Sequence, residues 1–133
     1  MNIALICVAL LGFLVVALGF AVSMTRAKTK TFFGYPMDPA DSLHKMVRAH
    51  GNTTEYAPIL AVVIFALGTL NPAPWILWCM GLATFSRYAI ALGIILSSSM
   101  EQAHPLRLIG SLGTYVFGIT LSVALLLKAG QLA

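Results

Sequence analysis

Acidic residues are scarce in this sequence, and charge of either sign is rare. Of its 133 residues, four are Asp or Glu and eight are Lys or Arg, so charged residues make up 9% of the chain. A soluble domain carries roughly 25%. Hydrophobic residues reach 59%, and the mean hydropathy is +0.92. This composition predicts an integral membrane protein, and the length predicts a single domain over residues 1–133.

Cysteine and dense basic clusters are also lacking. Cys7 and Cys79 lie inside apolar runs without the spacing of zinc ligands, so we expect inert buried thiols and no metal. The formal net charge of +4 comes from scattered Lys and Arg residues. They form no basic patch interleaved with aromatic residues, so we expect no nucleic-acid partner. The balance suits a membrane protein that keeps its cations on one side.

Three segments are apolar and long enough to cross a bilayer, which takes about 20 residues of helix. Residues 3–22 and 108–127 contain no charged residue, and residues 75–98 contain one, Arg87. No Lys or Arg precedes the first run. A signal peptide has a basic start and a shorter apolar core, so this segment is interpreted as a retained helix.

A fourth segment is too short by itself. Ala57 to Leu70 supplies 14 residues, about 21 Å of helix against a hydrocarbon core of roughly 30 Å. Asn71 and Pro72 close its far end, so the missing length must come from Gly51–Tyr56. The sequence therefore predicts an all-α integral membrane four-helix bundle, with spans at about 3–24, 44–70, 75–98 and 106–128.

The distribution of cations predicts the orientation of these spans. Arg26, Lys28 and Lys30 lie in the first connection, whereas the second, around "NPAP", has no charge. By the positive-inside rule the first connection is cytoplasmic and both termini face the other side; in a bacterium this would be the inner, or plasma, membrane. Within the first connection, "DPAD" predicts a helix start with Asp38 as N-cap and Pro39 at the first helical position.

The second predicted helix carries a polar stripe at membrane depth. Arg48, Asn52 and Glu55 are four and three residues apart, which places them within about 60° of one another on a helix. His50 points to roughly the opposite side, where a hydrogen-bonded structural role is expected. Pro58 removes one helical hydrogen bond and favours a kink beside Glu55.

Glu55 and Arg87 are expected at the same depth. Each is about 16 Å from the cytoplasmic end of its helix, at 1.5 Å of rise per residue. An unpaired charge at that depth costs at least about 2.5–3.5 kcal/mol. We therefore predict a Glu55–Arg87 ion pair. Its role is either purely structural or part of a ligand site, whereas Arg48 and Asn52, nearer the mouth, are expected to contact ligand.

Cations converge on the cytoplasmic mouth of the predicted bundle. Arg107 opens the fourth predicted helix at the same membrane face as Arg48, Arg26 and Lys28. Arginine suits carboxylates because its donors form a bidentate fork, and phosphates would fit equally well on charge alone. Four short helices enclose little volume, so a site of any size is expected between protomers of a homo-oligomer. Small residues at four-residue spacing predict close helix packing: Gly110, Thr114, Gly118 and Ser122, and likewise Ala89, Gly93 and Ser97.

The stretch "RAHGNTTEYAP" resembles the second-helix signature of a known family, the membrane-associated proteins in eicosanoid and glutathione metabolism (MAPEG). The pattern R-x-x-x-N-x-x-E-Y-x-P is matched at all five of its fixed positions. The four-span layout, the basic first connection, "SR" in the third predicted helix and "PLR" opening the fourth extend the resemblance over most of the chain. The short form is similar to the bacterial branch.

The resemblance implies a homotrimer that holds glutathione, as co-substrate and without a metal, between neighbouring subunits at the cytoplasmic side. It implies glutathione-contacting or scaffold roles for Arg48, Asn52, Glu55, Tyr56 and Arg87, with Arg26 a looser match. By the same resemblance Arg107 is the catalytic arginine, which would stabilise the thiolate because a nearby guanidinium lowers a thiol pKa. Family enzymes usually carry Tyr or His three and seven residues after the third-helix arginine, where this chain has Ile90 and Ile94.

Three functions are compared. The first is a glutathione-dependent transferase or peroxidase acting on hydrophobic small molecules that arrive from the membrane lipid. The second is a non-catalytic membrane scaffold that retains the fold and binds a lipid or a partner. The third, a small multidrug transporter, predicts an acidic residue in the first span, and residues 3–22 contain none.

Overall fold

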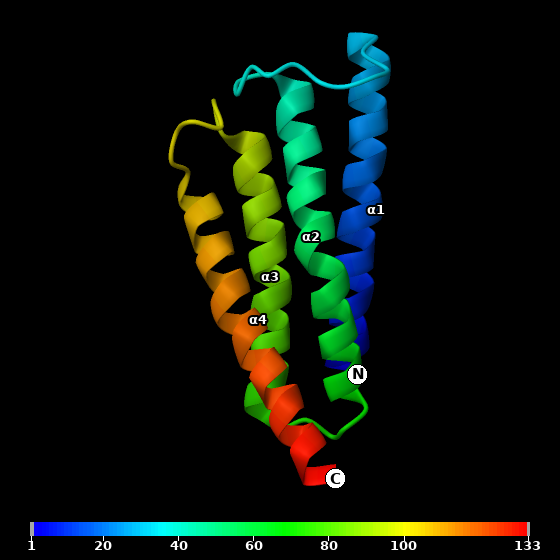
Figure 1. Ribbon diagram of the computed structural model, residues 1–133, viewed down its shortest axis with the longest axis vertical. Coiled ribbons are helices and arrows are strands. Elements are labelled where there is room, and N and C mark those ends of the chain that lie inside the picture. Colours follow the sequence, from blue (N-terminus) through cyan, green and yellow to red (C-terminus); the bar gives the residue numbers. More distant parts are fainter. Residues whose placement is uncertain (1, 133) are drawn as a thin grey trace.

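The computed structural model describes residues 2–132 as four helices that run alternately up and down (Figure 1). The two ends of the chain lie at the same end of the bundle (Figure 1). The predicted all-α four-helix architecture is confirmed. The helices are α1 (Ile3–Thr29), α2 (Ser42–Gly68), α3 (Pro74–Leu96) and α4 (Pro105–Leu132).

Short polar side chains and prolines define where the helices begin. The Asn2 side chain accepts a hydrogen bond from the Leu5 amide at the start of α1. At the start of α2 the N-cap is Asp41, whose carboxylate accepts from the His44 amide at 3.0 Å. The prediction of Asp38 as N-cap was therefore wrong. Asp38 instead accepts from the Ala40 amide at 2.9 Å and closes the turn that precedes the helix.

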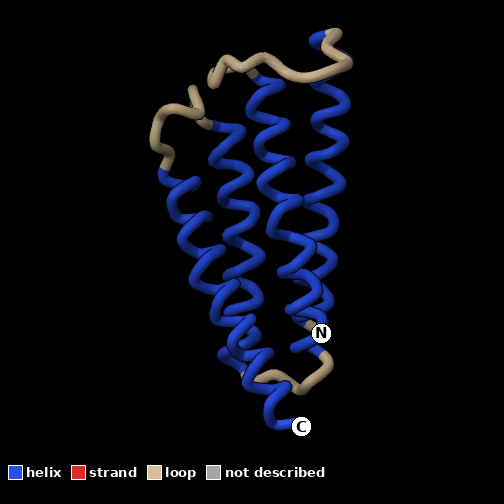
Figure 2. The backbone as a smooth tube through the Cα atoms, viewed as in Figure 1, coloured by secondary structure: helices blue, strands red, loops and turns tan. Residues whose placement is uncertain are grey.

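The helices pack in a fixed order, with α2 and α3 in the middle. α1 packs mainly on α2 and α4 mainly on α3, while α1 and α4 make no contact with each other over residues 2–132. Figure 2 shows the helices side by side along the long axis, with the connections confined to the two ends. The middle position of α2 and α3 brings their polar residues together inside the bundle.

Two apolar clusters form the interior. The larger lies toward the chain termini and includes Leu11, Ile64 and Met80. The smaller lies toward the first and third connections and consists of Leu14, Leu18, Ala49, Ile90, Ala91 and Ile94. The polar residues of α2 and α3 fall between these clusters in the sequence of each helix, so the candidate site is a polar layer between two apolar ones.

Glycines bring α3 and α4 into close contact. A Cβ atom added to Gly110 would lie 2.5 Å from the Ile90 amide nitrogen, and one added to Gly93 would lie 2.6 Å from the Arg107 amide nitrogen. Real Cβ atoms do not approach backbone so closely. The close packing predicted from the small-residue spacing is therefore confirmed at these two positions.

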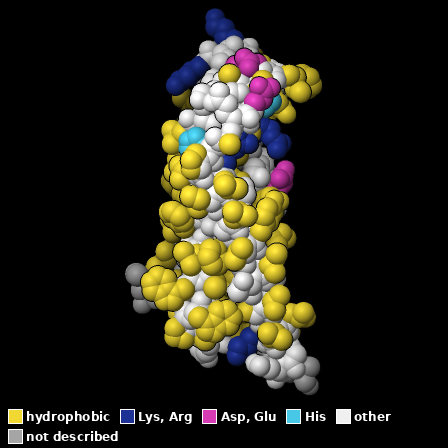
Figure 3. All heavy atoms as spheres, turned by 90° about the vertical axis from the view of Figure 1, so that its left-hand side faces the viewer, with side chains coloured by type: hydrophobic (Ala, Val, Ile, Leu, Met, Phe, Trp, Pro, Cys, Tyr) yellow, Lys and Arg dark blue, Asp and Glu magenta, His cyan; other side chains and the backbone are white. Residues whose placement is uncertain are grey.

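Three helices, α1, α3 and α4, are long and apolar enough to cross a membrane. α2 is as long as α1, with 27 residues, but its first half carries the polar stripe; that it crosses the bilayer too stays a prediction. The outward faces are apolar, with Phe13, Val16 and Trp78 among the most exposed. Figure 3 shows hydrophobic side chains over most of the visible face, with most of the charged ones toward its upper end and a basic side chain near the lower end.

Candidate functional site

The centre of the site is a buried arginine on α3. Arg87 is 1% exposed. Its Nη2 donates to the Asn52 carbonyl at 2.8 Å and to the Asn52 side-chain oxygen at 2.7 Å. Its Nη1 donates to the Thr114 hydroxyl of α4 at 3.3 Å. The guanidinium thus ties α2, α3 and α4 together at one level.

Two further contacts complete the surroundings of this guanidinium. The Thr114 hydroxyl donates its own proton to the Gly110 carbonyl at 2.7 Å, which leaves a lone pair for Arg87. The Tyr56 ring lies 5.1 Å from the Arg87 Cζ atom, within the range of a cation–π interaction. The Arg87 Nε atom is buried and has no hydrogen-bond partner within the described residues 2–132.

The predicted ion pair between Glu55 and Arg87 is not formed within the chain. Glu55 is exposed, and the acceptors of Arg87 in residues 2–132 are the neutral groups of Asn52 and Thr114. The reason is rotational, because residues three apart on a helix differ in direction by about 60°. The orientation of α2 that turns Asn52 toward α3 directs Glu55 away from it.

A groove runs between α2 and α4 beside this arginine. Its volume is about 330 Å³, and Glu55, Tyr56, Thr114 and Tyr115 lie along its lining, which is otherwise mostly apolar. The Tyr56 and Tyr115 hydroxyls are 3.4 Å apart, and their rings meet edge to face with centroids 6.0 Å apart. The groove therefore offers an apolar surface with the phenol hydroxyls of two tyrosines and one carboxylate.

The remaining candidate arginines are not brought together within one chain. Arg107 donates through Nη1 to the carbonyls of Met100 at 2.9 Å and Gln102 at 3.0 Å, in the connection before α4. Arg26 is likewise bonded to carbonyls of the first connection. Arg48 is exposed and has no hydrogen-bond partner among the described residues. Of the three, Arg48 alone has all its donors available to a ligand.

The positions that differ from the enzymes of the resembled family are apolar and buried. Ile90 is 7% exposed and Ile94 is 4% exposed, both in the smaller apolar cluster. His50 packs toward α1, where a Cβ on Gly19 would lie 3.3 Å from its Nε2 atom. None of these three side chains extends the polar layer around Arg87.

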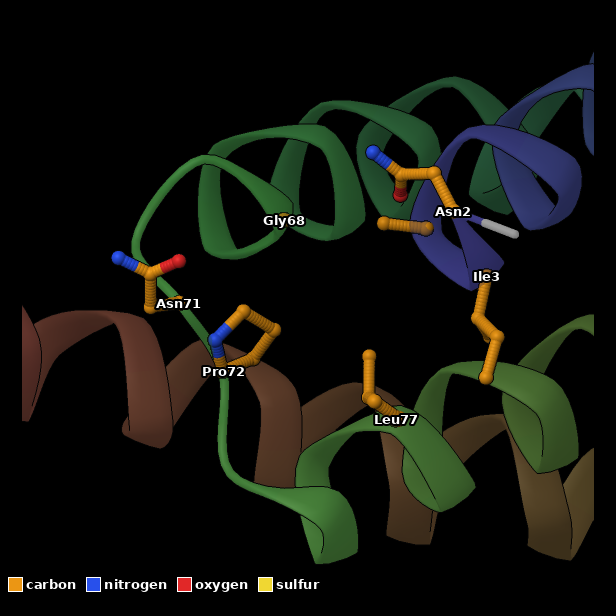
Figure 4. A pocket seen from close by; sticks show the side chains of 7 residues that line it. Asn2, Ile3, Gly68, Asn71, Pro72 and Leu77 are labelled. Atoms are coloured by element: carbon orange, nitrogen blue, oxygen red, sulfur yellow. The ribbon is translucent and has the colours of Figure 1, made fainter.

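A second cavity lies at the opposite end of the bundle, beside the chain start and the α2–α3 connection. Its volume is about 300 Å³, and Asn2, Gly68 and Asn71 are among its lining residues (Figure 4). No charged side chain lines it. Since it is remote from every arginine of the predicted site, it takes no part in the chemistry considered below.

Sequence reasoning missed two site residues, Thr114 and Tyr115. Thr114 was interpreted only as one of a row of small packing residues. A hydroxyl on the fourth helix at the depth of Arg87 was the signal available, because a buried guanidinium has five donors to satisfy. Tyr115 lies next to it in an apolar run, and nothing in its spacing indicated that it would meet Tyr56.

Taken together, a helical bundle with an apolar exterior and a buried arginine layer defines a polytopic membrane protein with an internal polar site. The sequence model of the MAPEG family matches residues 4–127, nearly the whole chain. The protein therefore belongs to the MAPEG family, whose members are glutathione-related transferases or peroxidases. No curated protein and no solved structure matches the chain.

Proposed function

We propose that this protein is a glutathione-dependent transferase or peroxidase of the membrane, acting on hydrophobic substrates. The observation that carries the proposal is the arrangement of Arg87, Asn52 and Tyr56 on the helices that bear the family signature. A full positive charge lies there among neutral acceptors. An anionic ligand nearby would offset part of the cost of burying it.

Glutathione is complementary in charge to the side chains that stay exposed in the chain. Glutathione has two carboxylates and one ammonium group. The exposed Arg48 guanidinium suits a carboxylate, and the exposed Glu55 carboxylate suits the ammonium. In our proposal the ligand lies between subunits of a homotrimer at the cytoplasmic side, because one chain leaves Arg48, Arg107 and Arg26 apart.

The proposed chemistry begins with loss of the thiol proton. Arg107 retains Nη2 and Nε, which have no partner in residues 2–132, while Nη1 stays on the loop carbonyls. A guanidinium beside the sulfur favours the thiolate, which is the nucleophile. In a transferase it forms a sulfur–carbon bond as the leaving group departs with the bonding electrons. In a peroxidase two glutathione molecules become a disulfide while a hydroperoxide is reduced to an alcohol and water.

The test is a glutathione titration of the purified protein in detergent, followed by thiolate absorbance near neutral pH. We expect a thiolate signal in the wild type and its loss, by tenfold or more, in Arg107→Ala. Lys128→Ala, at the far end of α4, is the matched control and should keep the signal. Because Arg107 also holds the connection before α4, a melting curve must show that Arg107→Ala is folded.

The second candidate is a non-catalytic scaffold that retains the fold. The apolar burial of Ile90 and Ile94 favours it, because those positions usually carry Tyr or His in enzymes of the family. It predicts no thiolate signal at any glutathione concentration and no effect of Arg107→Ala. Turnover of a hydrophobic electrophile or of an alkyl hydroperoxide, measured in the same preparations, would exclude it.

A further inference from the structure

The connection between α1 and α2 carries large apolar side chains that no other part of residues 2–132 covers. Phe32 is 79% exposed, Phe33 is 96% exposed and Met37 is 80% exposed. They lie at the end of the bundle where the charged residues gather. Exposed apolar groups that cluster in this way are typical of an interaction surface. We refer to residues 28–37, the last two residues of α1 and the first part of the connection, as the aromatic loop.

The aromatic loop is held in place by Arg26. α1 ends at Thr29, and Lys30 takes the left-handed conformation with φ of 54°. Arg26 Nη1 then donates to the Thr31 carbonyl at 3.2 Å and to the Gly34 carbonyl at 2.8 Å. These bonds fold residues 31–34 back beside the last turn of α1, and Figure 1 shows the chain dropping from the tip of α1 toward α2. The two phenylalanines are therefore held at the level of that turn.

That level corresponds to the headgroups of a bilayer. α1 has 27 residues, about 40 Å of helix, and the hydrocarbon core is roughly 30 Å thick. The apolar part of α1 ends at Met24, and Arg26 and Lys28 lie in its last turn. With the apolar part in the core, the last turn and the aromatic loop lie where aromatic residues and lysines meet lipid headgroups.

Two lysines of this surface retain their full charge for a partner. Lys28 and Lys30 are exposed, and their side-chain ammonium groups make no hydrogen bond or ion pair among the described residues. The two acids of the same connection, Asp38 and Asp41, accept backbone hydrogen bonds at the start of α2 instead. The aromatic loop thus combines an apolar surface with uncompensated positive charge.

We propose that the aromatic loop is a binding site for anionic phospholipid. Phe32 and Phe33 enter the boundary between headgroups and acyl chains, while Lys28 and Lys30 pair with the anionic headgroups. Charge complementarity favours lipid over a second copy of the chain, because an anionic headgroup neutralises the lysines whereas a second copy is itself cationic, with a formal net charge of +4. This proposal is independent of whether glutathione binds.

The first test measures which lipids stay on the purified full-length protein, by native mass spectrometry. Phosphatidylglycerol and phosphatidylcholine are offered at equal concentration in mixed micelles. We expect the anionic lipid to be retained in preference, and the double variant Lys28→Gln, Lys30→Gln to lose that preference by about tenfold, since each lysine near a lipid surface contributes severalfold. Lys128→Gln is the matched control for loss of a lysine at the opposite end.

Three results would overturn the proposal. The first is equal retention of both lipids by the wild type, and the second is an unchanged preference in the double variant. The third, measured after inorganic phosphate is added, is displacement of phosphatidylglycerol, which would identify a site for free anions rather than a lipid surface.

The second test measures how deeply residue 33 lies in the bilayer. Phe33→Trp is introduced with Trp75→Phe and Trp78→Phe, so that it is the sole tryptophan. In bilayers we expect its fluorescence to be quenched strongly by lipids brominated near the headgroup and weakly by lipids brominated at the chain end. Absence of headgroup quenching, together with a change of oligomeric mass in Phe32→Ser, Phe33→Ser, would show that a second copy covers the loop and refute the proposal.

Discussion

Removing the Asn52 side-chain oxygen is the most informative perturbation of the polar layer. In Asn52→Leu, Arg87 loses the acceptor at 2.7 Å and keeps the backbone carbonyl at 2.8 Å and the weaker contact with Thr114 at 3.3 Å. A hydrogen bond to a charged group contributes about 1.5–3 kcal/mol, whereas polar contacts between membrane helices average about 0.6 and reach about 1.7 kcal/mol. Because Arg87 is charged and 1% exposed, we expect a loss of about 1.5–1.7 kcal/mol, at the overlap of these ranges.

The assay is reversible unfolding in mixed detergent micelles, with Glu55→Gln as the comparison. Glu55 is exposed and is not an acceptor for Arg87, so its substitution should change the free energy of unfolding by less than about 0.5 kcal/mol. Arg87→Met should be nearly neutral or stabilising, since an apolar residue of similar volume removes a buried charge that lacks a carboxylate partner. A large effect of Glu55→Gln with little effect of Asn52→Leu would mean that the arginine pairs with the glutamate after all.

The remaining predictions concern packing and capping. Gly110→Ala should destabilise the protein by about 1–3 kcal/mol, because the new methyl group meets the backbone of Ile90; Gly81→Ala, with nothing within 4 Å, should be neutral or slightly stabilising. Equal effects of both substitutions in the same unfolding assay would contradict the close contact of α3 and α4. Asp41→Ala should cost about 1 kcal/mol through loss of the α2 N-cap, and Asp38→Ala less, as measured by thermal unfolding; the reverse order would restore the original assignment of the cap.

Arg87 keeps its full positive charge because its hydrogen-bond acceptors are neutral. A carboxylate partner in the chain would neutralise the guanidinium, whereas Asn52 and Thr114 leave its charge intact next to the groove between α2 and α4. An anion that approaches this region gains from the field of Arg87 without competing for its hydrogen bonds. The hydrogen bonds to Asn52 and Thr114 also hold the Arg87 guanidinium in one orientation before any ligand binds.

Much of the site was predictable because depth in a membrane follows from position along a helix. The prediction that Glu55 and Arg87 share one level, with Asn52 nearer the mouth, used only helical rise and the thickness of the hydrocarbon core. The structure instead brings Asn52 into contact with Arg87. The sequence reasoning chose Glu55 as the partner because it weighed depth and charge, and it had no information on the direction in which each side chain of α2 points.

The positions of Arg26 and Arg107 near the connections were predictable, but their hydrogen-bond partners were not. Arg26 and Arg107 were expected as free cations at the mouth of a binding site. In the folded chain each donates to carbonyls of its own connection, because irregular backbone has acceptors that no helix satisfies. Which carbonyls come within reach depends on the path of the connection, and this path leaves no periodic signal in the sequence.

The sequence by itself determined the number of helices and the approximate position of each along the chain, since these follow from apolar run length and the rise of a helix. Only the tertiary structure decided which neighbours each polar residue meets. That choice depends on the rotation of α2 about its own axis, set by its packing between α1 and α3. A turn of about 60° is enough to replace a carboxylate by an amide beside Arg87.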